Sequence, residues 1–372
     1  MQQANLYASD RHGECMQTPW GELSSLDQTK RELAHKILRW DKHQLVEGMV
    51  AENAFDQLLQ SVSDHTGDSL RILDIETYVC RSRGQSAELV VFVWARKKEK
   101  GLRACLNCLA KIAIVYLVEL EEGAFVAAKW ADSRRATAKI PLEEVVAQFG
   151  RWTDPTPVSS GVRDERRQNN AIWGFLDASL TVAQLWEQLA LPRLLVNFGL
   201  EPYFASTWNL DRFCVFNDEV WMLELKHKFP IGRGNRFGLN EGELDLMRLL
   251  SGSEIRIAHL IIVKPIWDAN AGSMYLFNQR ELRDRAALIG VEMTPRQIKN
   301  AYSRPRKVSK SHTTLKGTGS IFYRELPTGI FSQLGHYGDT SVSLSSTLTR
   351  LLSGEKLPTT SVPWLRQLAN MS

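Results

Sequence analysis

Apolar and polar residues alternate in short blocks along the first 150 residues, and the blocks change between helical and strand spacing. The predicted elements are a helix over 44–62, strands over 70–78, 88–95, 112–120 and 124–130, and a short helix from Pro141. The last two strands flank Glu121-Glu122-Gly123, as in a hairpin. This order predicts a separate N-terminal α+β domain over residues 1–152.

A second block of elements follows a stretch rich in Pro, Ser and Gly, which predicts a linker over 153–170. The predicted elements are a helix over 179–196, strands over 202–208, 210–216 and 219–228, a helix from Asn240, and a strand over 255–263. Asn240 and Glu243 have the spacing of a capping box. A further helix is predicted from Asn278 to Leu288, ended by Gly290. We therefore predict a core domain over 171–292 and a basic C-terminal extension over 293–372.

The run from Leu210 to Lys228 is the most informative part of the chain, because two strand-like stretches flank Asn217-Asp218. An Asn-Asp pair between such stretches predicts a two-residue hairpin turn. Phe216 would then pair with Glu219, and Asp211 would lie opposite Glu224 with Cβ atoms roughly 5 Å apart. Lys226 projects from the same face as Glu224, because side chains alternate along a strand.

Two facing carboxylates repel each other, and both stay ionised near neutral pH when a cation is shared between them. Hard oxygen ligands suit Mg²⁺, which binds one or two carboxylates and keeps several waters. A lysine beside such a metal can orient an attacking water or stabilise charge on a phosphate. The simpler interpretation is that these strand-end residues are only solvated, since Glu-x-Lys often arises by chance.

With these flanking elements, residues 175–270 resemble the core of the PD-(D/E)xK nuclease superfamily, which includes many restriction enzymes. The resemblance implies an α/β (α+β) fold with a restriction-endonuclease-like αβββαβ core around a mixed sheet. It also implies that Asp211, Glu224 and the carbonyl of Leu225 hold Mg²⁺, or Mn²⁺ in its place, and that Lys226 serves the attacking water. Glu187 matches an acidic residue that some members carry on the preceding helix, although it is equally typical of a solvated helix. Leu210 stands where many members have proline.

The loop from Gly232 to Gly238 contains Arg233 and Arg236, and its glycines permit close approach of a phosphate backbone. It also has the order strand, glycines, helix of a dinucleotide site. The glycine spacing is wrong for that fingerprint, and no clear second βαβ strand supplies the acidic residue. A loop that touches nucleic acid and an ordinary turn both stay open.

The segment from Met293 to Arg324 is strongly basic and contains no Asp or Glu, although the chain as a whole has a net charge of only +4. Tyr302, Phe322 and Tyr323 are interleaved with its basic residues. Such a segment suits a phosphate backbone, and the alternative is a solvated basic loop. The predicted nucleic-acid-binding residues are Arg233, Arg236, Arg296, Lys299, Arg304, Arg306, Lys307 and Lys310.

Composition narrows the class of protein further. The chain is 44% hydrophobic and 24% charged, which is ordinary for a folded protein with an ample core. The longest apolar stretch, 108–120, is too short to span a bilayer, and the N-terminus lacks a secretion signal. Five scattered cysteines favour reduced thiols, so we expect a cytoplasmic protein with no membrane partner. Cys105 and Cys108 form a lone close pair, which predicts buried small residues rather than zinc.

Together these patterns predict a Mg²⁺-dependent endonuclease that acts on DNA, with RNA as the open alternative. Prokaryotic defence, restriction or mobile-element biology would suit such an activity, as would a homodimer or a partner protein. The competing hypothesis is a non-catalytic nucleic-acid-binding or assembly protein that keeps the fold. The helix carrying Glu52, followed by a strand with Asp74, faintly resembles the later core, as an inactive duplicate of the nuclease fold would. The strand over 90–94 carries no Glu-x-Lys, however, so a recognition or partner-binding domain is the simpler prediction.

Overall fold

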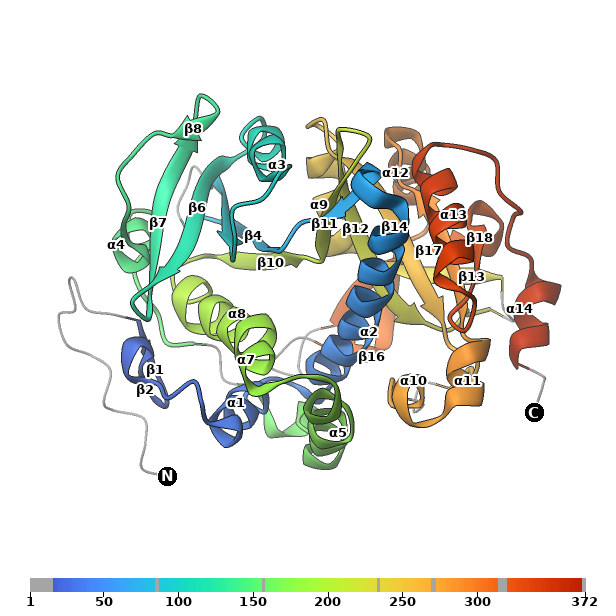
Figure 1. Cartoon of the computed structure of the whole chain (residues 1–372), viewed down its shortest axis with the longest axis horizontal. Helices are drawn as coiled ribbons and strands as arrows, with labels where there is room; N and C mark the ends of the chain where they lie inside the picture. The colour runs from blue at the N-terminus through green and yellow to red at the C-terminus, as the bar shows by residue number, and fades with distance from the viewer. Residues whose placement is uncertain are drawn as a thin grey trace. The chain divides into compact units, whose positions relative to one another are not determined.

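The computed structural model describes residues 16–83, 87–155, 158–232, 235–268, 272–313 and 320–369, and its fold is mixed α/β (Figure 1). The chain divides into two compact units that interleave in sequence. The first draws on Met1–Leu38, Asp74–Pro157 and Thr181–Leu210, and the second on Arg39–Leu73, Val158–Leu180 and Asp211–Ser372. The units therefore differ from the linear division predicted at 153–170, because each combines segments that are far apart in sequence.

The first unit contains a seven-stranded sheet in the order β10-β4-β5-β6-β7-β8, with β9 also paired to β7. Its strands are β4 (Ile75–Arg81), β5 (Leu89–Ala95), β6 (Ile114–Glu121), β7 (Ala124–Ala131), β8 (Arg134–Arg135), β9 (Ile140–Pro141) and β10 (Ser206–Leu210). All pairings are antiparallel except β5 with β6. The β6–β7 hairpin turns through Glu122 and Gly123, which both have positive φ, so that prediction is confirmed.

Helices complete the first unit: α1 (Arg31–Leu38), α3 (Leu102–Leu109), α4 (Leu142–Val146), and a helical run from Val182 to Leu200 that includes α7 (Val182–Leu185) and α8 (Leu191–Leu194). A capping box between Thr181 and Gln184 starts this run. The run matches the helix predicted over 179–196, but it belongs to the first unit and not to the second. Cys105 and Cys108 are buried on α3, as predicted.

The second unit is built on a six-stranded sheet in the order β18-β15-β14-β12-β11-β3. Its strands are β3 (Leu70–Ile72), β11 (Arg212–Phe216), β12 (Glu219–Lys228), β14 (Arg256–Val263), β15 (Ala287–Glu292) and β18 (Ser332–His336). Strands β12 and β14 are parallel and the other neighbours are antiparallel. The helix α9 (Glu241–Leu250) connects β12 to β14, as a parallel pair requires.

The predicted hairpin is confirmed in its register. Phe216 pairs with Glu219 and Arg212 pairs with Leu223. Asn217 and Asp218 both have positive φ, at 49° and 65°, as a type I′ turn requires. Asn and Asp tolerate this backbone conformation better than other non-glycine residues, so the two turn residues fix the pairing of both strands.

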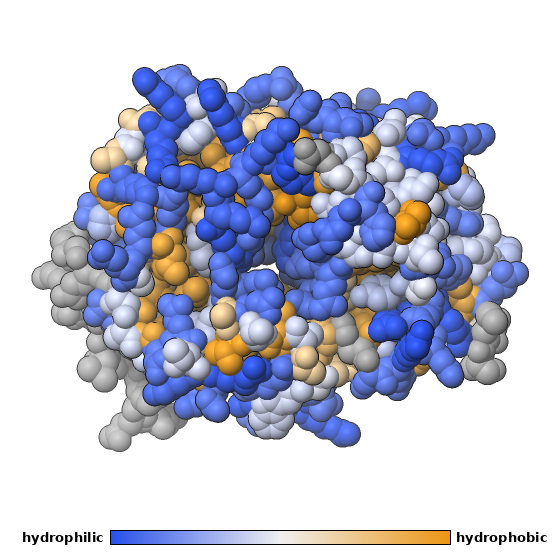
Figure 2. All heavy atoms as spheres, in the orientation of Figure 1, coloured by the Kyte–Doolittle hydropathy of each residue, from blue (hydrophilic) through white to orange (hydrophobic). Residues whose placement is uncertain are grey.

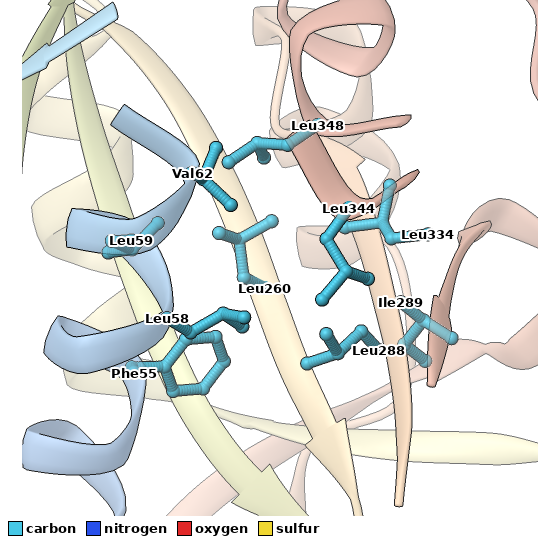
Figure 3. Close-up of a pocket in the computed structure, with 10 residues that line it drawn as sticks. All are labelled: Phe55, Leu58, Leu59, Val62, Leu260, Leu288, Ile289, Leu334, Leu344 and Leu348. Atoms are coloured by element: carbon cyan, nitrogen blue, oxygen red, sulfur yellow. The ribbon is translucent and has the colours of Figure 1, made fainter. Parts of the chain in front are cut away.

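Helix α2 (His43–Thr66) supplies one covering layer of the second unit's sheet, and α13 (Ser341–Leu352) packs beside it (Figure 1). Between these helices and strands β14 and β15 lies an apolar cavity of about 20 Å³, which is enough for one water-sized sphere (Figure 3). Its lining is aliphatic apart from Phe55, so this cavity is a feature of core packing. It is too small for a substrate.

One predicted helix end is wrong. Residues 278–290 do not form one helix: α10 (Tyr275–Asn278) and α11 (Arg280–Arg285) are short, and Gly290 lies inside β15. A Cβ atom at Gly290 would come within 2.7 Å of Leu351 and 2.8 Å of Leu260. The glycine therefore permits close packing of α13 and β14 against the strand, and it does not end a helix.

The basic C-terminal region forms part of the second unit. It contains helix α12 (Pro295–Tyr302) and the strands β16 (Lys307–Thr313) and β17 (Ser320–Pro327), which pair with the earlier strand β13 (Arg236–Asn240) in a three-stranded sheet of order β13-β17-β16. Helix α14 (Val362–Ala369) ends the described chain, and α5 (Glu165–Ala171) and α6 (Asp177–Ser179) lie earlier in sequence. Hydrophilic residues cover most of the molecular face in Figure 2. Among the described helices, none is both long and apolar enough to cross a membrane.

Candidate functional site

The two carboxylates predicted to face each other lie together in the second unit. Asp211 directly precedes β11, and the pairing of Arg212 with Leu223 places it opposite Glu224. Both residues are buried, with Asp211 9% and Glu224 5% exposed. The backbone N–H of Leu225 donates to Asp211 Oδ2 over 2.7 Å and holds that carboxylate against the strand. The hairpin register thus brings two acids into one protected place.

Lys226 places its ammonium among these acids. Its Nζ forms an ion pair with Glu224 and lies 3.4 Å from Asp211 Oδ2 and 3.5 Å from Glu243 Oε1. Burial alone would lower the pKa of Lys226, but the charges of these acids outweigh burial and raise the pKa well above its ordinary value. Lys226 is therefore a charged hydrogen-bond donor, and it is not a free base.

Glu243 joins the site through the start of α9. It forms the predicted capping box with Asn240, and this contact fixes its side chain in the first turn of the helix. Burial alone would raise the pKa of Glu243, but the ammonium groups of Lys226 and Lys228 hold it at about 2. Lys228 donates to the backbone carbonyl of Gly238 over 2.8 Å. Glu243 is thus an ionised partner for the lysines of β12.

Glu52 on α2 is a further acid of this site, and its presence could not be predicted from the hairpin. The protein around its carboxyl and the charge of Asp211 raise its pKa to about 7, in a balance with Arg212 and Lys226. Asp56, one turn along the same helix, forms a bidentate pair with Arg212 at 2.6 Å. That pair ties α2 to β11, so the helix face carrying Glu52 faces the hairpin.

The acids of the site lie close together, and their proximity affects the pKa of Glu224. Burial and the charge of Asp211 raise the pKa of Glu224 to about 8, while Lys226 opposes the shift. Thus one ammonium does not compensate fully for the removal of these carboxyls from water. A divalent cation would favour the ionised form of the same groups.

His259 is a buried residue of this region that the sequence analysis missed. It lies on β14 beside Glu224 in the parallel register and is fully buried. Burial and the charge of Lys228 lower its pKa to about 3, so the ring is neutral. Neither ring nitrogen has a hydrogen-bond partner within the described residues. His259 lies within an apolar strand run, where a buried histidine is usually a packing residue. The pattern therefore did not mark it as part of a site.

The donor set fits a hard divalent cation. Asp211 and Glu224 supply carboxylate oxygens, and the N–H of Leu225 donates to Asp211, so the backbone of Leu225 lies beside the first carboxylate. Among the described residues no three His, Cys, Asp or Glu side chains form a ready-made metal site. Mg²⁺ does not need one, because it binds through one or two carboxylates and retains several waters.

Glu187 was predicted to be a catalytic acid, but it belongs to the first unit, whereas Asp211 and Glu224 belong to the second. It lies in the helical run of the first unit, where its backbone carbonyl accepts a hydrogen bond from Arg96 Nε over 3.1 Å. The prediction assumed that the helix nearest in sequence covers the hairpin. Helix α2 contacts the hairpin instead, and its Glu52 lies near the charges of Asp211 and Lys226.

Many residues predicted to bind nucleic acid already have acidic partners. Arg236 and Lys307 pair with Glu325, and Arg306 pairs with Glu241 while stacking on Phe322. These acids lie outside the basic segment, so the segment is less positive in the fold than in the sequence. Arg296 and Lys299 are exposed on α12, and neither has an ion pair within the described part of the chain. Arg233 and the side chain of Lys310 lie outside the described residues.

The loop 232–238 does not support a dinucleotide site. Gly238 lies in β13, so a strand separates the loop from α9. Beside α12, a polar hollow of about 260 Å³ is lined by Gln297, Asn300, Ser303 and Arg304 together with Pro327 and apolar residues. Its amide and guanidinium groups suit polar contacts with a nucleic acid.

Comparison of the chain with protein-family models, with curated proteins and with solved structures gave no match.

Proposed function

We propose that this protein is a metal-dependent nuclease whose site comprises Asp211, Glu224 and Lys226. The observation that carries the proposal is the hairpin register. It places the two carboxylates opposite each other, buries both, and puts the Lys226 ammonium within ion-pair distance of each. Burying two acidic groups side by side costs stability. A metal-dependent phosphodiesterase uses such a pair to bind its cation.

The topology of the second unit supports the proposal. Apart from β13, which lies between β12 and α9 and joins another sheet, the elements α2, β3, β11, β12, α9 and β14 occur in the order helix, strand, strand, strand, helix, strand. This is the order that the resemblance to PD-(D/E)xK nucleases implies for a restriction-endonuclease-like core. Its first helix and strand come from a more distant segment than expected, which explains why Glu52 takes the place predicted for Glu187.

The roles of the residues follow from their positions. Asp211, Glu224 and the Leu225 carbonyl would hold Mg²⁺ or Mn²⁺, which supplies Lewis-acid activation of water and neutralisation of phosphate charge. The Leu225 N–H fixes the Asp211 carboxylate, and Glu243 holds the Lys226 ammonium from the other side. Lys226 donates hydrogen bonds, so it would orient the attacking water and stabilise the charge that develops on the phosphate.

The substrate class is inferred from the surface of the same unit. Helix α12 presents the exposed cations Arg296 and Lys299, and the polar hollow beside it carries Arg304. Cations position a phosphate backbone, and amide side chains contact base edges. We infer that the substrate is DNA, and RNA is the alternative that the test must include.

The direct test is cleavage of a nucleic-acid panel by the full chain. Supercoiled, linear, single-stranded and branched DNA, and RNA, are incubated with Mg²⁺, with Mn²⁺, or with EDTA. We expect cleavage of DNA in either metal and none in EDTA. Binding without cleavage of any substrate in either metal would contradict the proposal.

Salt dependence tests the surface separately from the chemistry. Replacing both Arg296 and Lys299 with alanine should lower the slope of log affinity against log salt for duplex DNA by about two, because each phosphate contact contributes roughly 0.9. The matched control is Arg280→Ala with Lys356→Ala, which removes two exposed charges elsewhere in the same unit. Binding is measured in EDTA. An equal slope change in both variants would show that only net charge matters.

A second candidate function has one observation in its favour. The acids of the hairpin already pair with Lys226, which is what a non-catalytic nucleic-acid-binding or assembly protein with a degenerate site would show. Divalent-metal binding separates the two. A nuclease binds Mg²⁺ or Mn²⁺ through Asp211, whereas a binding protein retains salt-sensitive affinity for nucleic acid and has little metal affinity.

A further inference from the structure

The first unit repeats the strand topology of the second. In the first unit, β10, β4, β5, β6 and β7 are neighbours in that order, and only β5 and β6 are parallel, with α3 between them. In the second unit, β3, β11, β12, β14 and β15 follow the same path, and only β12 and β14 are parallel, with α9 between them. Each path thus contains an outer strand, a two-stranded hairpin, a helix, a strand parallel to the second hairpin strand, and a last strand antiparallel to that one.

The two units exchange corresponding segments of the chain. Helix α2 and β3 belong to the second unit, and the chain then passes through Asp74 into β4 of the first. The helical run 182–200 and β10 belong to the first unit, and the chain then passes through Asp211 into β11 of the second. Each unit therefore takes its helix and outer strand from one half and its hairpin from the other.

In each unit the helix also bonds to the first strand of the hairpin, although at a different position of that strand and through different groups. In the second unit, Asp56 of α2 pairs with Arg212 of β11. In the first unit, the hydroxyl of Tyr78 on β4 donates to the carbonyl of Pro192 over 3.2 Å. In both units, then, a helix is tied to the first strand of the hairpin.

The register identifies the residues that correspond. Ile75 pairs with Ala95, so Asp74 lies opposite Arg96, just as Asp211 lies opposite Glu224. Counting along the strands places Arg96 at the position of Glu224. The first unit thus keeps the aspartate but has arginine in place of the second carboxylate, and β5 ends at Ala95, before the position of Lys226 is reached.

The Arg96 guanidinium is built into its unit. Its side chain is 6% exposed, and it bonds to Asp74 over 3.1 Å and to Glu76 over 2.7 Å. Its Nε donates to the carbonyl of Glu187, and its guanidinium lies over the ring of Trp94. A fixed internal cation therefore neutralises the acids of the first unit, and it cannot exchange as a metal ion can.

We propose that the chain is a fused pair of like modules with a single catalytic centre, in which Arg96 silences the first module and each chain cuts one strand of a duplex. The location of the active centre depends on the nuclease function proposed above, whereas the pairing of modules depends on topology alone. Cutting both strands at one place then requires two chains.

The test compares metal binding by the full chain in calorimetry with Mn²⁺. We expect wild type to bind at one centre, Glu224→Gln to lose that binding, and Asp74→Asn to leave it unchanged. Binding at two centres, of which Asp74→Asn removes one, would overturn the inference while leaving the nuclease function intact. A wild type with no Mn²⁺ binding would overturn the nuclease function itself, and with it the active centre.

A second measurement uses only the wild-type chain, in case Asp74→Asn does not fold. Supercoiled circular DNA is cut with enzyme limiting, and the open-circle and linear products are followed over time. One centre per chain predicts that open circles accumulate first and that linear DNA appears in a later, separate event. Linear DNA formed at the rate at which supercoiled DNA disappears, at every enzyme concentration, would contradict one cut per chain.

Discussion

Replacing Glu224 with glutamine should abolish cleavage while the protein stays folded. The loss should be at least on the order of 10³-fold, because the change removes a carboxylate from the metal centre and, with it, the charge stabilisation that the metal provides. The fold should persist, because the pKa of Glu224 is raised to about 8 and glutamine imitates the protonated carboxyl that burial favours. Divalent-metal binding, measured by calorimetry, should disappear with the activity.

The matched control for this variant is Glu219→Gln, the same substitution on the same strand. Glu219 is exposed and pairs with Arg256 over 2.6 Å, away from the acids of the site. Its glutamine variant should cut at the wild-type rate. Affinity for DNA in EDTA should be nearly equal in the two variants. If Glu224→Gln retained cleavage, or if both variants lost it equally, the hairpin acids would not be the catalytic centre.

The hairpin and the placement of its charged residues could be predicted because the signals for them are local. Asn217 and Asp218 select a two-residue turn, and that turn alone sets which residues lie opposite each other across two strands. The capping box at Asn240 is equally local, and it also positions Glu243. Where a few neighbouring residues determine geometry, the sequence analysis and the structure agree.

Long-range pairing could not be predicted in the same way. The helix over 182–200 has the expected amphipathic pattern, and nothing in that pattern states which sheet it covers. Two helical segments of similar pattern, this helix and α2, each precede a hairpin in the sequence. Neither belongs to the unit of the hairpin that follows it. Helix α2 joins β11 and β12, and the helix over 182–200 joins β4 and β5. Glu52 was therefore assigned to another domain and Glu187 to the site. The order of a helix with Glu52 and a strand with Asp74 resembles the later core, and this resemblance is weak in the sequence because the first hairpin lacks Glu-x-Lys.

Charge was the other misleading signal. The segment 293–324 is uniformly basic in sequence, but Glu241 and Glu325 approach it from outside in the fold. A run of like charge predicts a positive surface only where no distant acid folds back onto it. Among the described residues, the predicted cations Arg296, Lys299 and Arg304 have no ion pair, and the salt-dependence experiment uses the two that are exposed, Arg296 and Lys299.

Replacing Lys226 with methionine should separate catalysis from metal binding. Methionine keeps most of the volume of the side chain but removes the ammonium that pairs with Glu224 and Asp211. Cleavage should fall about 10²- to 10⁴-fold, the range for a group that takes part in proton transfer or charge stabilisation. Metal binding should persist, because the carboxylates remain and lose a competing cation.

The same variant should respond more strongly to metal in thermal unfolding. Without Lys226, two buried carboxylates have no adjacent ammonium, so the metal-free protein should unfold at a lower temperature than wild type. Mg²⁺ binds only the folded state and restores the missing charge, so it should raise Tm by more in Lys226→Met than in wild type. Lys356→Met, an exposed lysine of the same unit, is the control and should match wild type in Tm and cleavage. A Lys226→Met protein that cuts normally would exclude the proposed role of the ammonium. One that loses activity and metal binding together would instead give Lys226 a structural role, in holding the acids of the site in place.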